Sequence, residues 1–103
     1  MDIFDFGDDD SVKAIIKKAA ELFEFPAFQL YLTVQGNSKL KNALLKYDVS
    51  FYEDAIKRIN ALSSESTKVF ERAKLQRLVF GESGISSGDV RKMCEKMDDM
   101  YYR

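Results

Sequence analysis

Apolar residues recur every three or four positions along most of the chain, the spacing that places them on one face of an α-helix. The pattern is clearest between residues 38 and 62, where it predicts a helical hairpin with a break at residues 47–49. Ser50 and Glu53 match a capping box, so Ser50 is expected to cap the second helix. The apolar positions of this predicted hairpin are Leu40, Leu44, Leu45, Phe51, Ala55, Ile56, Ile59 and Leu62.

The segment before the hairpin predicts two further helices. The first is expected to be capped by Asp10 or Ser11 and to end at Phe25, because a residue before proline is pushed out of the helical region. Residues 27–35 alternate as a strand would, yet they also fit a helix started by Pro26. We favour the helix, since no second strand-like run exists to pair with. The apolar face of the first helix is Val12, Ile15, Ile16, Ala19, Leu22 and Phe23.

Two more helices are predicted after the hairpin. Ser64 or Ser66 is expected to cap a helix that runs to about Phe80, and Ser86 or Ser87 starts the last one after a glycine-containing loop. The apolar residues of the first of these are spread too widely for one stripe, which predicts a central position with several neighbours. They are Val69, Phe70, Ala73, Leu75, Leu78, Val79 and Phe80, and the inward face of the last helix is Val90, Met93, Cys94, Met97, Met100 and Tyr101.

These elements predict an all-α fold, a compact bundle of five to six short helices. A chain of 103 residues can build one core, so residues 11–103 are expected to form a single helical domain. Residues 1–10 contain five aspartates, which resist burial, and they are predicted to form a flexible acidic arm.

The overall charge is nearly balanced but unevenly distributed. The formal net charge is −1, which argues against a protein attracted as a whole to nucleic acid or to an anionic membrane. Residues 38–80 nevertheless hold nine bases and five acids, whereas residues 1–37 hold three and seven. A binding surface built on charge is therefore expected in the middle of the chain.

The residues needed for common catalytic chemistry are scarce. The chain has no histidine, which removes the commonest general base and metal ligand, and a single cysteine cannot build a zinc site. We expect no enzymatic activity, no cofactor and no metal. Cys94 falls on an apolar helix face, so it is expected to be buried; a lone cysteine also favours a reducing, cytoplasmic location. No apolar run is long enough to cross a bilayer, and no membrane association is expected.

Protein binding is the function class that these observations favour. The chain has thirteen aromatic residues, a surplus for so small a core, and tyrosine is common at interfaces. We predict a non-catalytic interaction module, a small regulator, inhibitor or adaptor, that is monomeric or homodimeric. Aromatic side chains expected at the surface are Tyr31, Tyr47, Phe51, Tyr52, Tyr101 and Tyr102. The predicted partner-binding residues are Lys57, Arg58, Lys68, Arg72, Lys74, Arg77, Tyr52, Phe4 and Phe6.

Nucleic-acid binding through the basic segment 57–77 is the alternative. Residues 44–59 have the length of a helix-turn-helix, a motif whose second helix reads bases with its N-terminal end. Here that end carries Glu53 and Asp54, two acids that would repel phosphate. Protein binding is therefore the favoured hypothesis.

Overall fold

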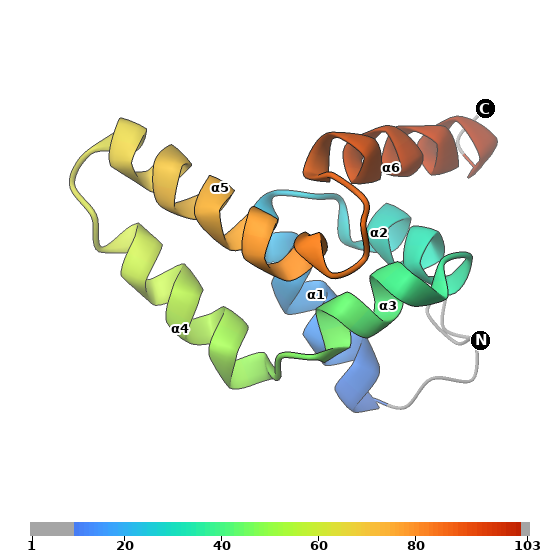
Figure 1. The fold of residues 1–103 in the computed structure, drawn as a ribbon, viewed down its shortest axis with the longest axis horizontal. Helices are drawn as coiled ribbons and strands as arrows, with labels where there is room; N and C mark the ends of the chain where they lie inside the picture. The colour runs from blue at the N-terminus through green and yellow to red at the C-terminus, as the bar shows by residue number, and fades with distance from the viewer. Residues whose placement is uncertain (1–9, 102–103) are drawn as a thin grey trace.

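The computed structural model describes the backbone of residues 10–101 and the side chains of residues 10–96. Within this range the chain forms six helices and no strand, so the predicted all-α fold is confirmed (Figure 1). The predictions for residues 1–9 of the acidic arm, and for the side chains of Met97, Met100, Tyr101 and Tyr102, lie outside the described residues, whereas Asp10, the last residue of the predicted arm, begins α1. The helices are α1 (Asp10–Phe23), α2 (Ala27–Gln35), α3 (Ser38–Leu45), α4 (Val49–Asn60), α5 (Glu65–Gly81) and α6 (Ser87–Tyr101).

Polar side chains cap the helices at the breaks that the sequence indicated. Ser64 accepts a hydrogen bond from the backbone N–H of Thr67 at 3.4 Å, which starts α5. Ser86 accepts one from the N–H of Asp89 at 3.2 Å, at the start of α6. Each cap satisfies an N–H group that has no partner inside its own helix.

The prediction that Ser50 caps the second helix of the hairpin is wrong. The N-cap of α4 is Asp48, whose carboxylate accepts a hydrogen bond from the N–H of Phe51 at 3.0 Å. The Ser50 hydroxyl donates to the same carboxylate at 2.7 Å. These bonds, that of Ser50 foremost, lower the pKa of Asp48, because they stabilise its charged form. Asp48 lies two residues earlier, where its side chain folds back over the first turn.

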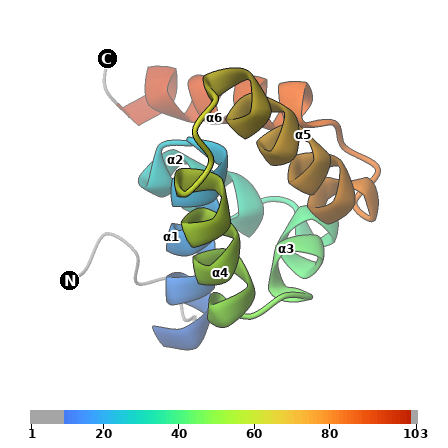
Figure 2. The same cartoon turned by 90° about the vertical axis from the view of Figure 1, so that its left-hand side faces the viewer.

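The centre of the fold is formed by α1 and α2 (Figures 1 and 2). Helix α1 packs against α2, α3, α4 and α5, and α2 also packs against α3 and α6. Residues 29–34 of α2 are all buried, so this helix is enclosed on every side. The prediction of a helix at 27–35 is confirmed. Because residues 29–34 are all buried, the helix has no clear contrast between an apolar and a polar face, which explains why its periodicity was ambiguous.

Helix α5, which was expected to be central, lies at the periphery. Only its last turns reach the core, where Val79 and Phe80 are buried. Val69, Phe70 and Leu78 are 59%, 57% and 53% exposed. The wide spread of apolar residues in α5 therefore does not reflect burial on all sides: Val69 and Phe70 lie in first turns that extend past the core, and Leu78, near the end of the helix, is exposed beside the buried Val79 and Phe80.

The two helices of the predicted hairpin both contact α1 and α5, and only α3 also contacts α2. The main packing partner of α4 is α1, whereas the contacts of α3 are spread over three helices. They are linked where they meet by the buried hydroxyl of Tyr52, which donates a hydrogen bond to the carbonyl oxygen of Leu44 at 2.7 Å. The ring of Tyr52 also contacts the ring of Phe23 edge-on, with centroids 6.4 Å apart. The contacts of Tyr52 with Leu44 and Phe23 therefore join α4 both to α3 and to α1.

Candidate partner-binding groove

Helices α4 and α5 border an apolar groove on the surface of the molecule. The two helices lie side by side and are joined by the short loop at residues 61–64 (Figure 1). The space between them has a volume of about 650 Å³. We call it the α4–α5 groove, and its lining residues are Arg58, Ile59, Ala61, Leu62, Glu71, Lys74, Leu75 and Leu78.

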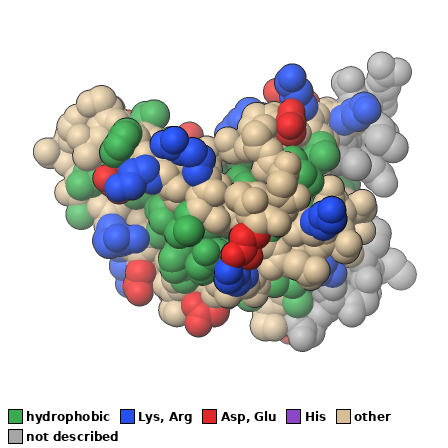
Figure 3. Space-filling model, viewed as in Figure 1, with side chains coloured by type: hydrophobic (Ala, Val, Ile, Leu, Met, Phe, Trp, Pro, Cys, Tyr) green, Lys and Arg blue, Asp and Glu red, His purple; other side chains and the backbone are tan. Residues whose placement is uncertain are grey.

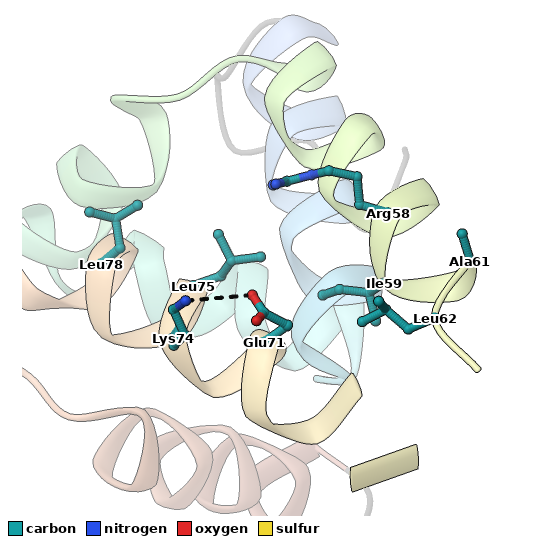
Figure 4. A pocket seen from close by; sticks show the side chains of 8 residues that line it. All are labelled: Arg58, Ile59, Ala61, Leu62, Glu71, Lys74, Leu75 and Leu78. Carbon is teal, nitrogen blue, oxygen red and sulfur yellow. Dashed lines mark ion pairs between the residues drawn. The ribbon is translucent and has the colours of Figure 1, made fainter. Parts of the chain in front are cut away.

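The apolar lining follows from helical spacing on both walls. On α5, residues 71, 74, 75 and 78 are three or four positions apart, so they share one face. Ile59 is buried in the groove, Leu75 is half-buried, and Leu78 is 53% exposed. In Figure 4, Arg58 from α4 and Leu75 from α5 both point into the space between the two helices. The groove therefore deepens from an exposed leucine to a buried isoleucine.

Two cations stand on opposite walls of the groove. Arg58 is exposed on α4 and forms no ion pair with another residue of the described range. Lys74 on α5 lies 3.8 Å from the carboxylate of Glu71 and 5.6 Å from the ring centroid of Phe70. Figure 3 shows the same arrangement, an apolar area between α4 and α5 bordered by basic side chains. The lining contains one acid, Glu71, and two bases, Arg58 and Lys74, so its net charge is positive.

The structure brings only two of the predicted basic residues together in the groove, Arg58 and Lys74. Lys57, although next to Arg58 in sequence, faces α1 and lines a different hollow with Lys18 and Glu53. Arg77 lines a third hollow, against the loop before α6. The basic segment 57–77 is thus divided among several faces, because successive residues of a helix point in different directions.

Two further predicted binding residues make contacts within the chain. Arg72 is half-buried; its Nε donates to the carbonyl oxygen of Leu22 at 3.0 Å, and its guanidinium lies 3.2 Å from the carboxylate of Glu24. Lys68 pairs with Glu65 at 3.3 Å on the surface of α5. Arg72 has a structural role at the end of α1, and its availability to a partner is correspondingly reduced.

The prediction that Tyr31 and Tyr52 lie at the surface is wrong. Both side chains are fully buried, whereas Tyr47 and Phe51 are half-buried and their rings stack with centroids 4.4 Å apart. Tyr52 cannot contact a partner, because it fills the space between α1, α3 and α4. It shares one face of α4 with Ala55 and Ile59, and this spacing was the signal that it belongs to the core. Phe4 and Phe6 lie outside the described residues.

The groove leucines were not among the predicted binding residues. Their spacing predicts that Leu62, Leu75 and Leu78 belong to the apolar faces of the helices that pack in the bundle. The sequence signal that could have identified them is the wide spread of apolar residues around α5. A helix with such a wide apolar surface needs either additional neighbouring helices or a binding partner to cover it. Only the tertiary arrangement decides between the two.

No protein-family model, curated protein or solved structure matches the chain. None of the helices between residues 10 and 101 combines the length and apolar character needed to cross a bilayer.

Proposed function

We propose that this protein is a non-catalytic interaction module, acting as a small regulator, inhibitor or adaptor, that binds a partner protein through the α4–α5 groove. The observation that carries the proposal is the exposed side chain of Leu78 at the mouth of a groove lined by further apolar residues. An isolated exposed leucine is ordinary, but one that continues into an apolar hollow is typical of an interaction surface. A cytoplasmic location remains part of this proposal.

The free energy of burying apolar side chains favours a partner that covers the α4–α5 groove. Complete burial of a leucine side chain contributes roughly 1.5–3 kcal/mol relative to its exposure to water. Leu78 retains about half of that contribution, since it is 53% exposed, and Leu75 and Leu62 are only half-buried. A partner that inserts side chains between α4 and α5 would bury the exposed parts of several leucines at once, and the binding would gain the free energy of that burial. Such central, desolvated contacts commonly dominate the affinity of an interface.

Nucleic-acid binding through residues 57–77 is less well supported by the arrangement of the cations. A phosphate backbone is bound by several cations on a common face. Here Arg72 points toward α1, Lys57 and Arg77 lie in separate hollows, and Lys68 is paired with a neighbouring acid. The apolar lining between Arg58 and Lys74 is also better suited to a protein side chain than to a phosphate.

Co-purification with two matched variants tests the proposal. Leu78→Glu places a charge in the groove, whereas Val69→Glu places one at a site of similar exposure on the same helix but outside the groove. We expect the wild type and Val69→Glu to recover the same partner protein, and Leu78→Glu to lose it. Circular dichroism of both variants confirms that each is folded.

Two results would overturn the proposal. Equal recovery of the partner by folded Leu78→Glu would mean that the groove is not the binding surface. Loss of the recovered protein after nuclease treatment would mean that the contact is made through nucleic acid.

A further inference from the structure

We infer that the partner segment seated in the α4–α5 groove is an acidic amphipathic helix. This inference rests on the proposed function and specifies the chemistry of the partner. It combines three features of the groove: its apolar floor, the positions of its two cations, and the helical backbone of its walls.

The charges of the groove select an acidic segment. Arg58 and Lys74 stand on opposite walls, so a segment lying between them meets a cation along each edge. Arg58 forms no ion pair with a described residue, and the one ion pair of Lys74 within that range is the 3.8 Å contact with the carboxylate of Glu71. Both cations are therefore available to carboxylates of a partner. A basic segment would instead meet like charges on both sides, which is the usual way in which an interface rejects a wrong partner.

The backbone of the groove walls favours a helix over an extended strand. An extended peptide binds best at the open edge of a sheet, where unpaired N–H and C=O groups continue the ladder. The described part of the chain contains no strand, and the groove is walled by α4 and α5, whose backbone groups are paired within each helix. Such walls offer side chains only. An amphipathic helix, which presents an apolar face and keeps its own backbone paired, fits this surface.

The dimensions of the α4–α5 groove determine how long a stretch of the partner helix it contacts and how the inserted side chains are spaced. The face of α5 from residue 71 to residue 78 covers eight residues, a length of roughly 10 Å at the helical rise. A volume of about 650 Å³ accepts a row of side chains rather than a whole helix, which is about 10–12 Å across. The segment is therefore expected to insert apolar residues at positions i, i+3 or i+4, and i+7, with acids flanking that stripe on both sides.

A pair of synthetic peptides tests the inference on the full chain. Both have four helical turns and leucines at i, i+3, i+4 and i+7; one carries glutamates at the flanking positions and the other lysines. We expect the acidic peptide to bind at least about tenfold more tightly than the basic one in a fluorescence-anisotropy titration. NMR shift changes should be centred on the methyl groups of Leu75 and Leu78.

Two double variants with the same change in net charge locate the selectivity. Arg58→Glu/Lys74→Glu reverses the groove cations, whereas Lys57→Glu/Arg77→Glu reverses their neighbours on the same helices, which lie outside the groove. We expect the first to lose the preference for the acidic peptide and the second to keep it. Equal weakening by both folded variants would mean that long-range charge is responsible, and would overturn the inference.

The inference and the proposed function fail in different ways. Equal binding of both peptides, abolished by Leu78→Glu, overturns the acidic preference and leaves the groove as the binding surface. Failure of the acidic peptide to bind at millimolar concentration overturns the inference, whereas the proposed function is decided by the co-purification with Leu78→Glu and Val69→Glu.

Discussion

The Nε–H of Arg72 in α5 donates a hydrogen bond to the carbonyl oxygen of Leu22 in the last turn of α1, 3.0 Å away and 50 residues earlier in the chain. The last carbonyls of a helix have no partner within it, so a cation there both satisfies a hydrogen bond and interacts favourably with the helix dipole. Arg91 of α6 makes longer contacts, 3.4 Å, with the next two carbonyl oxygens, those of Phe23 and Glu24. Arginine side chains from both α5 and α6 therefore reach the end of α1.

Replacing Arg72 should destabilise the fold. We expect Arg72→Met to lower the free energy of unfolding by about 1–2 kcal/mol, because the variant leaves the carbonyl of Leu22 without its charged donor. Arg77→Met is the control, since Arg77 is exposed on the same helix and makes no hydrogen bond or ion pair within the described range. Urea unfolding measures both. Equal stability of the two variants would contradict the structural role assigned to Arg72.

The residue after α1 provides a test of backbone conformation. Glu24 has a φ of 61°, in the left-handed region that favours glycine, and the N–H of Phe25 closes the helix by donating to the carbonyl oxygen of Ala20 at 2.9 Å. Glu24→Gly and Glu24→Ala both remove the ion pair with Arg72, so their difference isolates the backbone. We expect the glycine variant to be more stable than the alanine variant by about 1 kcal/mol in urea unfolding. The opposite order would exclude a left-handed residue at this position.

The buried phenol of Tyr52 should make stability depend on pH in the alkaline range. Burial, foremost, and the neighbouring Tyr47 raise the pKa of Tyr52 well above its ordinary value of about 10. As the pH rises through 10, the unfolded state releases this proton while the folded state retains it. The contribution of Tyr52 to stability is therefore complete below about pH 10 and decreases above it.

Tyr52→Phe separates this effect from other alkaline titrations. At pH 7 the variant should lose about 1–2 kcal/mol of stability, because the carbonyl of Leu44 loses its buried donor. Between pH 9 and 11 its free energy of unfolding should fall less steeply than that of the wild type. Parallel curves for the two proteins in urea titrations at each pH would mean that Tyr52 does not titrate differently in the folded state.

The thiol of Cys94 should be protected in the folded protein. Its side chain is 2% exposed, and burial, the largest effect, raises its pKa above the ordinary value. Both properties disfavour the reactive thiolate at neutral pH. We expect a thiol-specific reagent to modify the native protein at least about a hundredfold more slowly than the protein in urea, because modification requires opening of the core. Similar rates in both conditions would show that α6 opens readily.

The sequence predicted the helices well because their signals are local. Apolar spacing and the serines at positions 64 and 86 define where helices begin, and each acts within a few residues. The wrong cap at Ser50 arose because Asp48, two residues earlier, competes for the same N–H groups, and its carboxylate is the acceptor that captures them. The prediction of a helix at residues 27–35 was correct, because the sequence contains no second strand-like run with which a strand could pair.

The candidate site could be predicted only in part, because it depends on contacts between distant residues. The sequence selected Arg58 and Lys74 as basic binding residues but could not distinguish them from Arg72, whose partner, Leu22, lies 50 positions away. Burial of Tyr52 likewise depends on α1 and α3. The groove itself exists only because α4 and α5 pack on α1 with open space between them, and helical periodicity does not encode that arrangement.

Site-specific photocrosslinking tests the central claim, that the α4–α5 groove is a protein-binding surface, most directly. A photoreactive amino acid replaces Leu78 inside the groove or Val69 outside it, two exposed positions on the same helix. Irradiation in cells should join one partner protein to the chain from position 78 and not from position 69. No product from position 78, or the same product with equal yield from position 69, would contradict the claim.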